Sequence, residues 1–284
     1  MKKLIYILFA ITTLTACSED IELELSSTQS YLVVDGHLFD KSTKLNYVRL
    51  TSSTNYFSNQ LSPAVSGASV IVSDGTNEYQ FEERDTLGYY VPPVLFSVKQ
   101  NCTYTLTVNV DFDNDGQSET YTATSSTPAT YEIDSVQCNY DKYFDAFKVG
   151  LFAHEDTETD NFYLFGVAVN DSLLRNTYTN LSKTTDKWFS SDYCWGATVY
   201  LFNNDDIEGR NVAIGDKVTM YAMNVNEDFY NYLSAIDDIA NGSNPMFSST
   251  PANAVGNISG GALGFFTVIS VVGKDCYVTD IGKQ

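Results

Sequence analysis

The stretch TYTLTVNV at residues 103–110 decides the fold class of this chain. Apolar and polar residues alternate strictly along it, so one face carries a tyrosine, a leucine and two valines while the other carries three threonines and an asparagine. Tyr, Val and Thr also favour extended backbone. The stretch therefore predicts a β-strand with one buried face and one solvated face.

Similar short segments recur on both sides of this strand, separated by Gly, Asn, Asp, Ser and Pro. They predict strands at 31–38, 45–52, 68–73, 77–82, 103–110, 118–124, 132–139, 145–153, 161–169, 196–203, 211–214, 217–225 and 262–272. One helix is predicted over 227–239, with Asn226 as its cap and an apolar stripe at helical spacing. The pattern indicates an all-β protein.

Pro128, within Ser125-Ser126-Thr127-Pro128-Ala129, marks the best boundary between two halves. We expect an Ig-like or transthyretin-like β-sandwich over 30–128 and a second β-rich lobe, holding the helix, over 129–284. A long polar stretch at 170–192 is expected to be a surface excursion and a contact surface.

The first sixteen residues have the pattern of a cleaved export signal. Lys2 and Lys3 precede an apolar run at 4–14, which is too short to span a bilayer. Leu14-Thr15-Ala16-Cys17 resembles a bacterial lipobox, so Cys17 is predicted to carry the lipid anchor. Residues 17–29 form an acidic tether, and its Ser18-Glu19-Asp20-Ile21-Glu22 start resembles the signal that sends lipoproteins to the exterior of the outer membrane.

The chain is strongly acidic, with 16 Lys and Arg against 36 Asp and Glu and a formal net charge of −20 at pH 7. Because nucleic-acid binding needs clustered basic side chains, nucleic acid is not expected as a partner. The acidity instead favours solubility and divalent cations.

The segment DFDNDG at 111–116 resembles a calcium-binding loop. Asp111, Asp113 and Asp115 alternate before a glycine turn, and Glu119 can supply a further oxygen ligand. Thr122 stands where an EF-hand carries its glutamate, and strands rather than helices flank the segment. A structural Ca²⁺ site and an ordinary acidic turn both fit; no other cofactor is expected.

Four cysteines follow Cys17, namely Cys102, Cys138, Cys194 and Cys276. In an exported chain they are candidates for two disulfides with three alternative connectivities. Buried free thiols fit equally well, and the absence of a C-x-x-C pair argues against zinc.

Signals for catalysis are few. His37 and His154 are the only histidines, and no motif for a nucleophile, a metalloprotease or a phosphate loop is present. His37 is expected to be structural, and the acidic loop after His154 to be a solvated turn. We therefore predict no catalytic residue and no enzyme, with a hydrolase that uses paired carboxylates as one alternative.

The many aromatic residues belong mostly to the core. Those that flank the polar stretch, Trp188, Phe189, Tyr193 and Trp195, are candidates for an exposed platform, although core packing is the favoured expectation, particularly for Trp195 next to Cys194. Aromatic faces stack on sugar rings and pack against peptide side chains, so the platform would suit a glycan or a peptide ligand.

Several blocks together resemble a named family. They are the lipobox, YLVVDG at 31–36, PAVSGASVIV at 63–72, DNFY at 160–163, FYNYL at 229–233 and PANAVGNISGGALGFF at 251–266. The chain resembles the Bacteroidetes outer-membrane lipoproteins called domain of unknown function four-two-four-nine. The resemblance implies a surface accessory of a TonB-dependent outer-membrane transporter that captures a nutrient, with no catalytic residue to carry over. A structural or adhesive surface protein is the other alternative.

A short glycosylation pattern of exported proteins in that phylum also occurs here. Asp85-Thr86-Leu87 and Asp171-Ser172-Leu173 match it, which makes Thr86 and Ser172 candidates for O-glycosylation.

Overall fold

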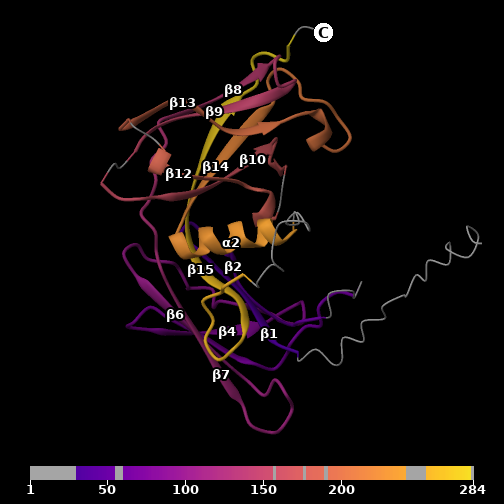
Figure 1. The fold of residues 1–284 in the computed structure, drawn as a ribbon, viewed down its shortest axis with the longest axis vertical. Helices are drawn as coiled ribbons and strands as arrows, with labels where there is room; N and C mark the ends of the chain where they lie inside the picture. Colours follow the sequence, from indigo (N-terminus) through magenta and orange to yellow (C-terminus); the bar gives the residue numbers. More distant parts are fainter. Residues whose placement is uncertain are drawn as a thin grey trace, which may run out of the picture. The chain divides into compact units, whose positions relative to one another are not determined.

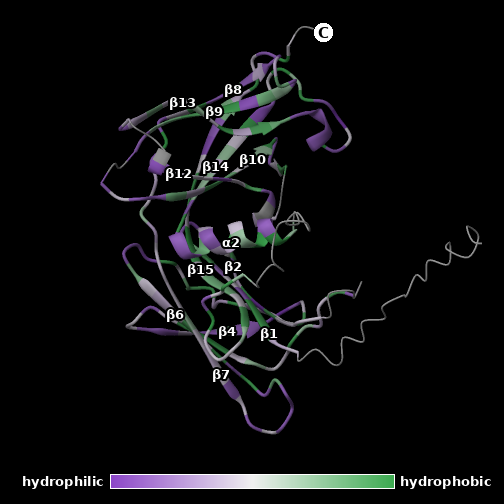
Figure 2. Ribbon diagram, viewed as in Figure 1, coloured by the Kyte–Doolittle hydropathy of each residue, from purple (hydrophilic) through white to green (hydrophobic). Residues whose placement is uncertain are grey.

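The alternating stretch forms strand β6 (Thr103–Val110), as predicted. Tyr104, Leu106 and Val108 are buried, whereas Thr103 on the opposite face is exposed. The computed structural model describes residues 30–54, 60–155, 158–174, 177–188, 191–240 and 254–282. Figure 2 shows hydrophobic residues concentrated along the strands and hydrophilic residues in the turns.

Six further strands accompany β6 in the N-terminal half (Figure 1). They are β1 (Leu32–Phe39), β2 (Ser42–Ser52), β3 (Ser69–Ser73), β4 (Glu78–Glu83), β5 (Tyr89–Val91) and β7 (Glu119–Ser126).

The C-terminal half adds eight strands, three short 3-10 helices and, within the described residues, one α-helix. The strands are β8 (Ser135–Asp141), β9 (Ala146–His154), β10 (Phe162–Val169), β11 (Ser172–Leu173), β12 (Ser182–Thr185), β13 (Tyr193–Phe202), β14 (Lys217–Val225) and β15 (Leu263–Tyr277). The helices are η1 (Tyr178–Asn180), η2 (Asp186–Trp188), η3 (Asn204–Asp206) and α2 (Glu227–Ala240). The predicted helix is confirmed, with Phe229 and Leu233 on its buried side.

The strands form two sheets. The larger has twelve strands in the order β11-β10-β14-β15-β1-β2-β5-β4-β3-β6-β7, with β12 paired to β10 outside this path, and the smaller has the order β13-β9-β8. Neighbouring strands are antiparallel except for β1 and β15, which pair in parallel from Val33 opposite Leu263 to Phe39 opposite Ile269. The two-sheet arrangement confirms the all-β, sandwich-like fold class.

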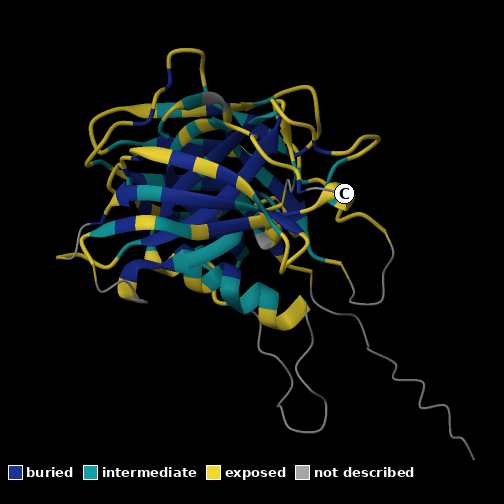
Figure 3. Ribbon diagram, turned by 90° about the horizontal axis from the view of Figure 1, so that it is seen from above, coloured by how far each residue is buried: buried dark blue, intermediate teal, exposed yellow. Residues whose placement is uncertain are grey.

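Three groups of buried side chains fill the fold, and β15 contributes to each. The N-terminal core lies among β1–β7 and includes Phe266. The C-terminal core lies between the small sheet and strands β10 and β14, and Val272 packs against it. The helix core lies beneath α2 and includes Phe265. Since neighbouring side chains of a strand point to opposite faces, one long strand can serve several cores; Figure 3 shows the central strands almost wholly buried.

The glycine-rich segment before β15 covers the free edge of β7. The Asn257 side chain donates to the carbonyl oxygens of Thr124 (3.2 Å) and Phe266 (2.8 Å) and accepts the Phe266 amide (2.9 Å). The Ser259 amide donates to the Thr122 carbonyl oxygen, and the Thr122 amide donates to Ser259 Oγ, both at 2.8 Å. These bonds satisfy backbone groups that an exposed edge strand would leave open.

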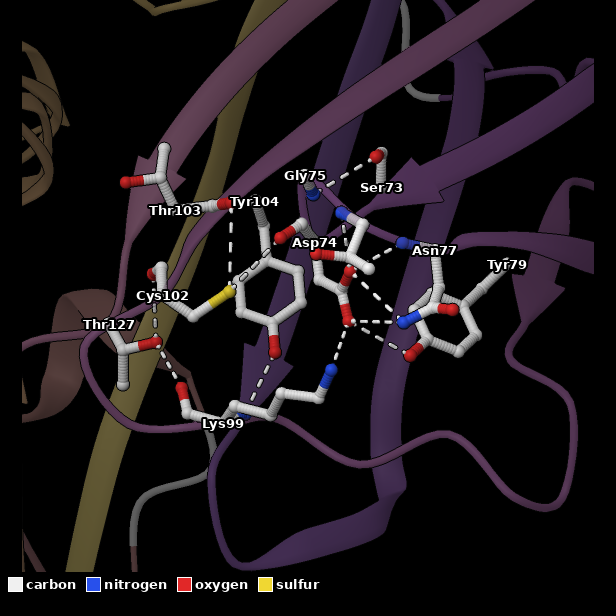
Figure 4. A network of polar contacts seen from close by, with 11 residues as sticks. Ser73, Asp74, Gly75, Asn77, Tyr79, Lys99, Cys102, Thr103, Tyr104 and Thr127 are labelled. Carbon is white, nitrogen blue, oxygen red and sulfur yellow. Dashed lines mark hydrogen bonds and ion pairs between the residues drawn. The ribbon is translucent and has the colours of Figure 1, made fainter.

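Asp74 holds the turn after β3 to the loop before β6 (Figure 4). Its carboxylate pairs with the Lys99 ammonium and accepts hydrogen bonds from the amides of Thr76 (2.9 Å) and Asn77 (2.7 Å) and from the Tyr79 hydroxyl (3.0 Å). The Lys99 hydrogen bond, followed by the Asn77 amide, holds the pKa of Asp74 well below its usual range. This pairing therefore stabilises the fold at neutral pH, and its contribution is lost as the pH falls below the ordinary carboxyl pKa toward the lower folded value.

Two sequence-based predictions are wrong in detail. Residues 211–214 form no strand. The described part of the polar stretch 170–192 is not a simple excursion, because β12 pairs with β10, and Leu181 and Asp186 are buried. A four-residue polar strand such as Ser-Lys-Thr-Thr has no hydrophobic alternation to reveal it; its place is set by backbone pairing with β10.

The predicted boundary at Pro128 falls between β7 and β8, where the chain leaves the large sheet for the small one. The chain later returns, and Tyr31–Gln284 forms one compact unit. The division into separate domains over 30–128 and 129–284 stays a prediction.

Gly264 is the position where β15 most needs a glycine. Its φ is +102°, and an added Cβ would overlap the carbonyl oxygen of Val34 on β1. Gly261 in the same segment also has a positive φ of +80°, but an added Cβ there would meet open space. We expect Gly264→Ala to cost about 3 kcal/mol or more, because it combines backbone strain with overlap in a packed interior.

The matched variant Gly261→Ala should cost only about 1 kcal/mol, since it adds strain alone. Urea unfolding followed by circular dichroism measures both. Equal losses in the two variants would contradict the close approach of β15 to β1.

Candidate functional site

Two aromatic side chains in contact lie on β13, an exposed Trp195 and a partly exposed Tyr193, so the core packing favoured for Trp195 is wrong and its place on a platform stays a prediction. Tyr193 and Trp195 are two residues apart, so their side chains share a face, and their ring centroids lie 4.4 Å apart at a tilt of 52°. The Trp195 side chain is 79% exposed. His154, paired with Tyr193 across the β9–β13 ladder, meets its ring edge-on at 4.7 Å. The three rings form what we call the aromatic row.

The local backbone explains why Trp195 faces solvent next to a buried cysteine. Cys194 points into the protein, and Trp195 takes the opposite face of the strand. The β9–β13 register shifts just after Trp195, at Gly196, whose φ is +74°. Such a bulge bends and twists a strand locally. Of the other predicted platform residues, Phe189 and the side chain of Trp188 lie outside the described structure.

The acidic segment forms the turn between β6 and β7. Ligand oxygens of Asp111, Asp113, Asp115 and Glu119 all lie within 4.8 Å of one another. The Gly116 amide donates to Asp111 Oδ2 (3.0 Å), the Gln117 amide to Asp115 Oδ1 (2.7 Å) and the Phe112 amide to Glu119 Oε2 (2.8 Å). Asp111 Oδ1 is buried and has no hydrogen-bond partner.

The oxygen-only donor set fits a hard cation such as Ca²⁺. A buried carboxylate oxygen without a partner is costly, and a bound cation would satisfy it. The sequence identified all four residues of this cluster.

Beneath α2 lies a cavity of about 330 Å³ that sequence analysis did not identify. Asp35 and Arg49, directly opposite each other on β1 and β2, border it together with Phe229, Tyr232 and Phe265. No local motif could have revealed this site, because its residues come from strands and a helix far apart in the sequence.

His37 occupies the floor of this cavity and is structural, in agreement with the prediction that it lies in a strand. It is 2% exposed, and its Nε2 lies 2.5 Å from Asp35 Oδ1. The Tyr178 ring stacks on it with centroids 4.6 Å apart. The Tyr47 hydroxyl donates to Asp35 Oδ2 at 3.3 Å. Burial acts to raise the pKa of Asp35, but the interaction with His37, the Tyr47 hydrogen bond and the nearby Arg49 charge together outweigh it, so the pKa is lowered and the carboxylate stays ionised at neutral pH.

A buried carboxylate lies in the loop that was expected to be a solvated turn. Glu155 is 8% exposed. It accepts hydrogen bonds from the hydroxyls of Tyr131 (2.5 Å) and Tyr163 (3.1 Å) and from the Cys194 thiol (3.4 Å). The solvated-turn prediction is therefore wrong for Glu155, whose three donors satisfy it as a structural group.

The four cysteines of the described residues are all free thiols in the structure. Cys138 and Cys194 are buried, whereas Cys102 and Cys276 are partly exposed. Burial, followed by the neighbouring Cys276, raises the pKa of Cys138 to about 12. Burial and then Glu155 raise the pKa of Cys194 to about 12, and burial and then Asp275 raise that of Cys276 to about 11. These three thiols are protonated at neutral pH and are poor nucleophiles.

The remaining predicted sites are at the surface or outside the described residues. Thr86 lies exposed in the turn between β4 and β5, and Ser172 lies exposed in β11. Cys17 and the acidic tether lie outside the described part of the chain. Among the residues that the structure describes, no helix combines the length and the hydrophobicity that crossing a membrane requires.

The family model described as "Domain of unknown function (DUF4249)" matches residues 18–275. No curated protein matches the chain. Because the family model covers most of the sequence, the chain belongs to the DUF4249 family.

Proposed function

We propose that this protein is a lipid-anchored, non-enzymatic binding protein on the exterior of the outer membrane. It captures a glycan or peptide nutrient and works with a TonB-dependent transporter. The observation that carries the binding role is the aromatic row, in which Trp195 is 79% exposed and packs against Tyr193. A single exposed apolar side chain is common, but here three rings contact one another across two paired strands, and contiguous exposed patches mark binding surfaces.

The anchoring part of the proposal rests on the leader. The apolar run, the lipobox-like sequence ending at Cys17 and the acidic tether after it favour export and lipidation. Several acyl chains, at about 0.8 kcal/mol for each buried methylene, would hold the protein on a membrane stably. The resemblance to lipoproteins associated with transporters supports a TonB-dependent transporter as the partner.

The aromatic row offers ring faces rather than a closed pocket. Ring faces stack on the apolar face of a sugar and also pack against aromatic or aliphatic peptide side chains. Because the protein is strongly acidic, a neutral glycan or a basic peptide suits this surface better than an acidic ligand.

Trp195→Ala should weaken binding to the best ligand of a glycan and peptide panel at least tenfold, because it removes the largest ring of the row, which is 79% exposed. Isothermal titration calorimetry measures the affinity. The control is Tyr143→Ala, which removes an aromatic ring that is 88% exposed in the β8–β9 turn, outside the row. Unchanged affinity in Trp195→Ala, or equal losses in both variants, would refute the role of the row.

The native lipoprotein should co-purify with a β-barrel transporter when membranes are solubilised in mild detergent. The control is Cys17→Ala, which lacks the predicted lipidation site and should be recovered from the soluble fraction without the transporter. Recovery of the wild-type protein alone would instead favour a structural or adhesive role.

We further propose that the acidic turn binds a structural Ca²⁺ ion. The four carboxylates converge within 4.8 Å, and Asp111 Oδ1 lacks any other partner. The ion would stiffen the β6–β7 connection.

Ca²⁺ should raise the melting temperature, because a ligand that binds only the folded state stabilises it by about 2.7 kcal/mol at one hundred times its Kd. Asp113→Asn should reduce this shift, whereas Asp85→Asn, in another exposed turn, should not. Differential scanning fluorimetry with Ca²⁺ or with chelator measures the effect. A titration without heat and without a change in melting temperature would dispose of the metal site.

A further inference from the structure

We propose that the cavity beneath α2 is a second binding site, which takes a zwitterionic α-amino acid with an apolar side chain. The ammonium group would pair with Asp35, the carboxylate with Arg49, and the side chain would enter the aromatic part of the cavity. This site is separate from the aromatic row, because it is built on β1, β2, β15 and α2 rather than on β9 and β13.

The size and walls of the cavity limit the ligand to a small, largely apolar molecule. Its volume of about 330 Å³ lies at the small end of the range for ligand pockets, roughly 300–1,000 Å³. Phe229, Tyr232 and Ile236 of α2 form one wall, and Phe265 of β15 another. A cavity of this size and lining suits one amino-acid side chain better than an oligomer.

The polar end of the cavity carries both signs of charge. Asp35 and Arg49 are direct partners in the β1–β2 ladder, so their side chains project from the same face side by side. Among the described residues, no ion pair within 4.0 Å joins them. The Arg49 guanidinium carbon lies instead 5.3 Å from the centre of the Tyr89 ring. Arg49 therefore has no carboxylate partner within 4.0 Å among the described residues, and Asp35, which is already paired with His37, accepts one hydrogen bond on each of its two oxygens and can accept more from a ligand.

The protein holds the Asp35 carboxylate ready for a cation. His37 Nε2 binds one carboxylate oxygen at 2.5 Å, and the Tyr47 hydroxyl binds the other at 3.3 Å. The Asp35 side chain is nevertheless 45% exposed, so a ligand can reach it. A charged group fixed by buried neighbours but open on one side is preorganised for binding, which reduces the entropy lost when the ligand binds.

Other ligand classes fit these groups less well. A sugar has hydroxyls around its whole ring, and most would face apolar walls without partners, at a cost of about 1–3 kcal/mol for each. A fatty acid would pair with Arg49 but place its carboxylate beside Asp35. A simple amine would pair with Asp35 but lie beside the Arg49 charge. A zwitterion satisfies both Asp35 and Arg49, because an α-amino acid carries its ammonium and its carboxylate side by side on one carbon.

Isothermal titration calorimetry of the purified protein with L-phenylalanine tests the proposal. We expect saturable binding, with at least tenfold weaker binding of phenethylamine, which lacks the carboxylate, and of 3-phenylpropionate, which lacks the ammonium. D-glucose should not bind at this site. Absence of L-phenylalanine and L-leucine binding at millimolar concentration, or equal binding of all the analogues, would overturn it.

Variants locate the site. Asp35→Asn and Arg49→Gln should each weaken L-phenylalanine binding at least tenfold. Arg84→Gln, which alters a surface arginine paired with Glu82 at 2.7 Å, should not. If Asp35→Asn fails to fold, Arg49→Gln and the analogue series decide. Trp195→Ala should leave amino-acid binding unchanged, which separates failure of this site from failure of the proposed function. Weaker L-phenylalanine binding in Trp195→Ala, or unchanged binding in Arg49→Gln, would contradict the assignment.

Discussion

The parallel pairing of β15 with β1 is the constraint on which the rest of the structure depends. The last strand of the chain returns to the first, and its other edge pairs with β14. Because it runs for fifteen residues, it supplies Phe266 to the N-terminal core, Phe265 to the helix core and Val272 to the C-terminal core. The close approach to β1 needs a glycine at 264, and Asn257 and Ser259 fasten the preceding segment to β7. The two halves thereby share one sheet.

This arrangement also places the candidate sites. Phe265, Asp35 and Arg49 are aligned across β15, β1 and β2, so the cavity beneath α2 exists only because the end of the chain returns to its beginning. The aromatic row lies on the three-stranded sheet, whose inner side packs against the C-terminal core. The buried residues of β13, Cys194 among them, face this core, and Trp195 lies on the opposite face of the strand, where we propose that ligands bind.

Local patterns revealed the long helix, most of the longer strands and the acidic turn. The alternation at 103–110 and the helical spacing of Phe229 and Leu233 are visible in any short window, and both were confirmed. The four converging carboxylates lie within nine residues, so a loop pattern was sufficient to group them. The burial of Glu155, the pairing of β12 and the cavity around Asp35 depend on contacts between distant segments, which no short window contains. Core packing was the favoured expectation for Trp195, and neither its exposure nor the bulge at Gly196 that accompanies it follows from the sequence pattern.

Differential scanning calorimetry tests most directly whether β15 unites the two halves. The shared sheet predicts one cooperative transition over Tyr31–Gln284, with a calorimetric enthalpy equal to the van't Hoff enthalpy. Two resolved transitions, one for the strands before Pro128 and one for those after it, would contradict the account. Each half would then unfold independently of the other, although β15 contributes to the cores of both.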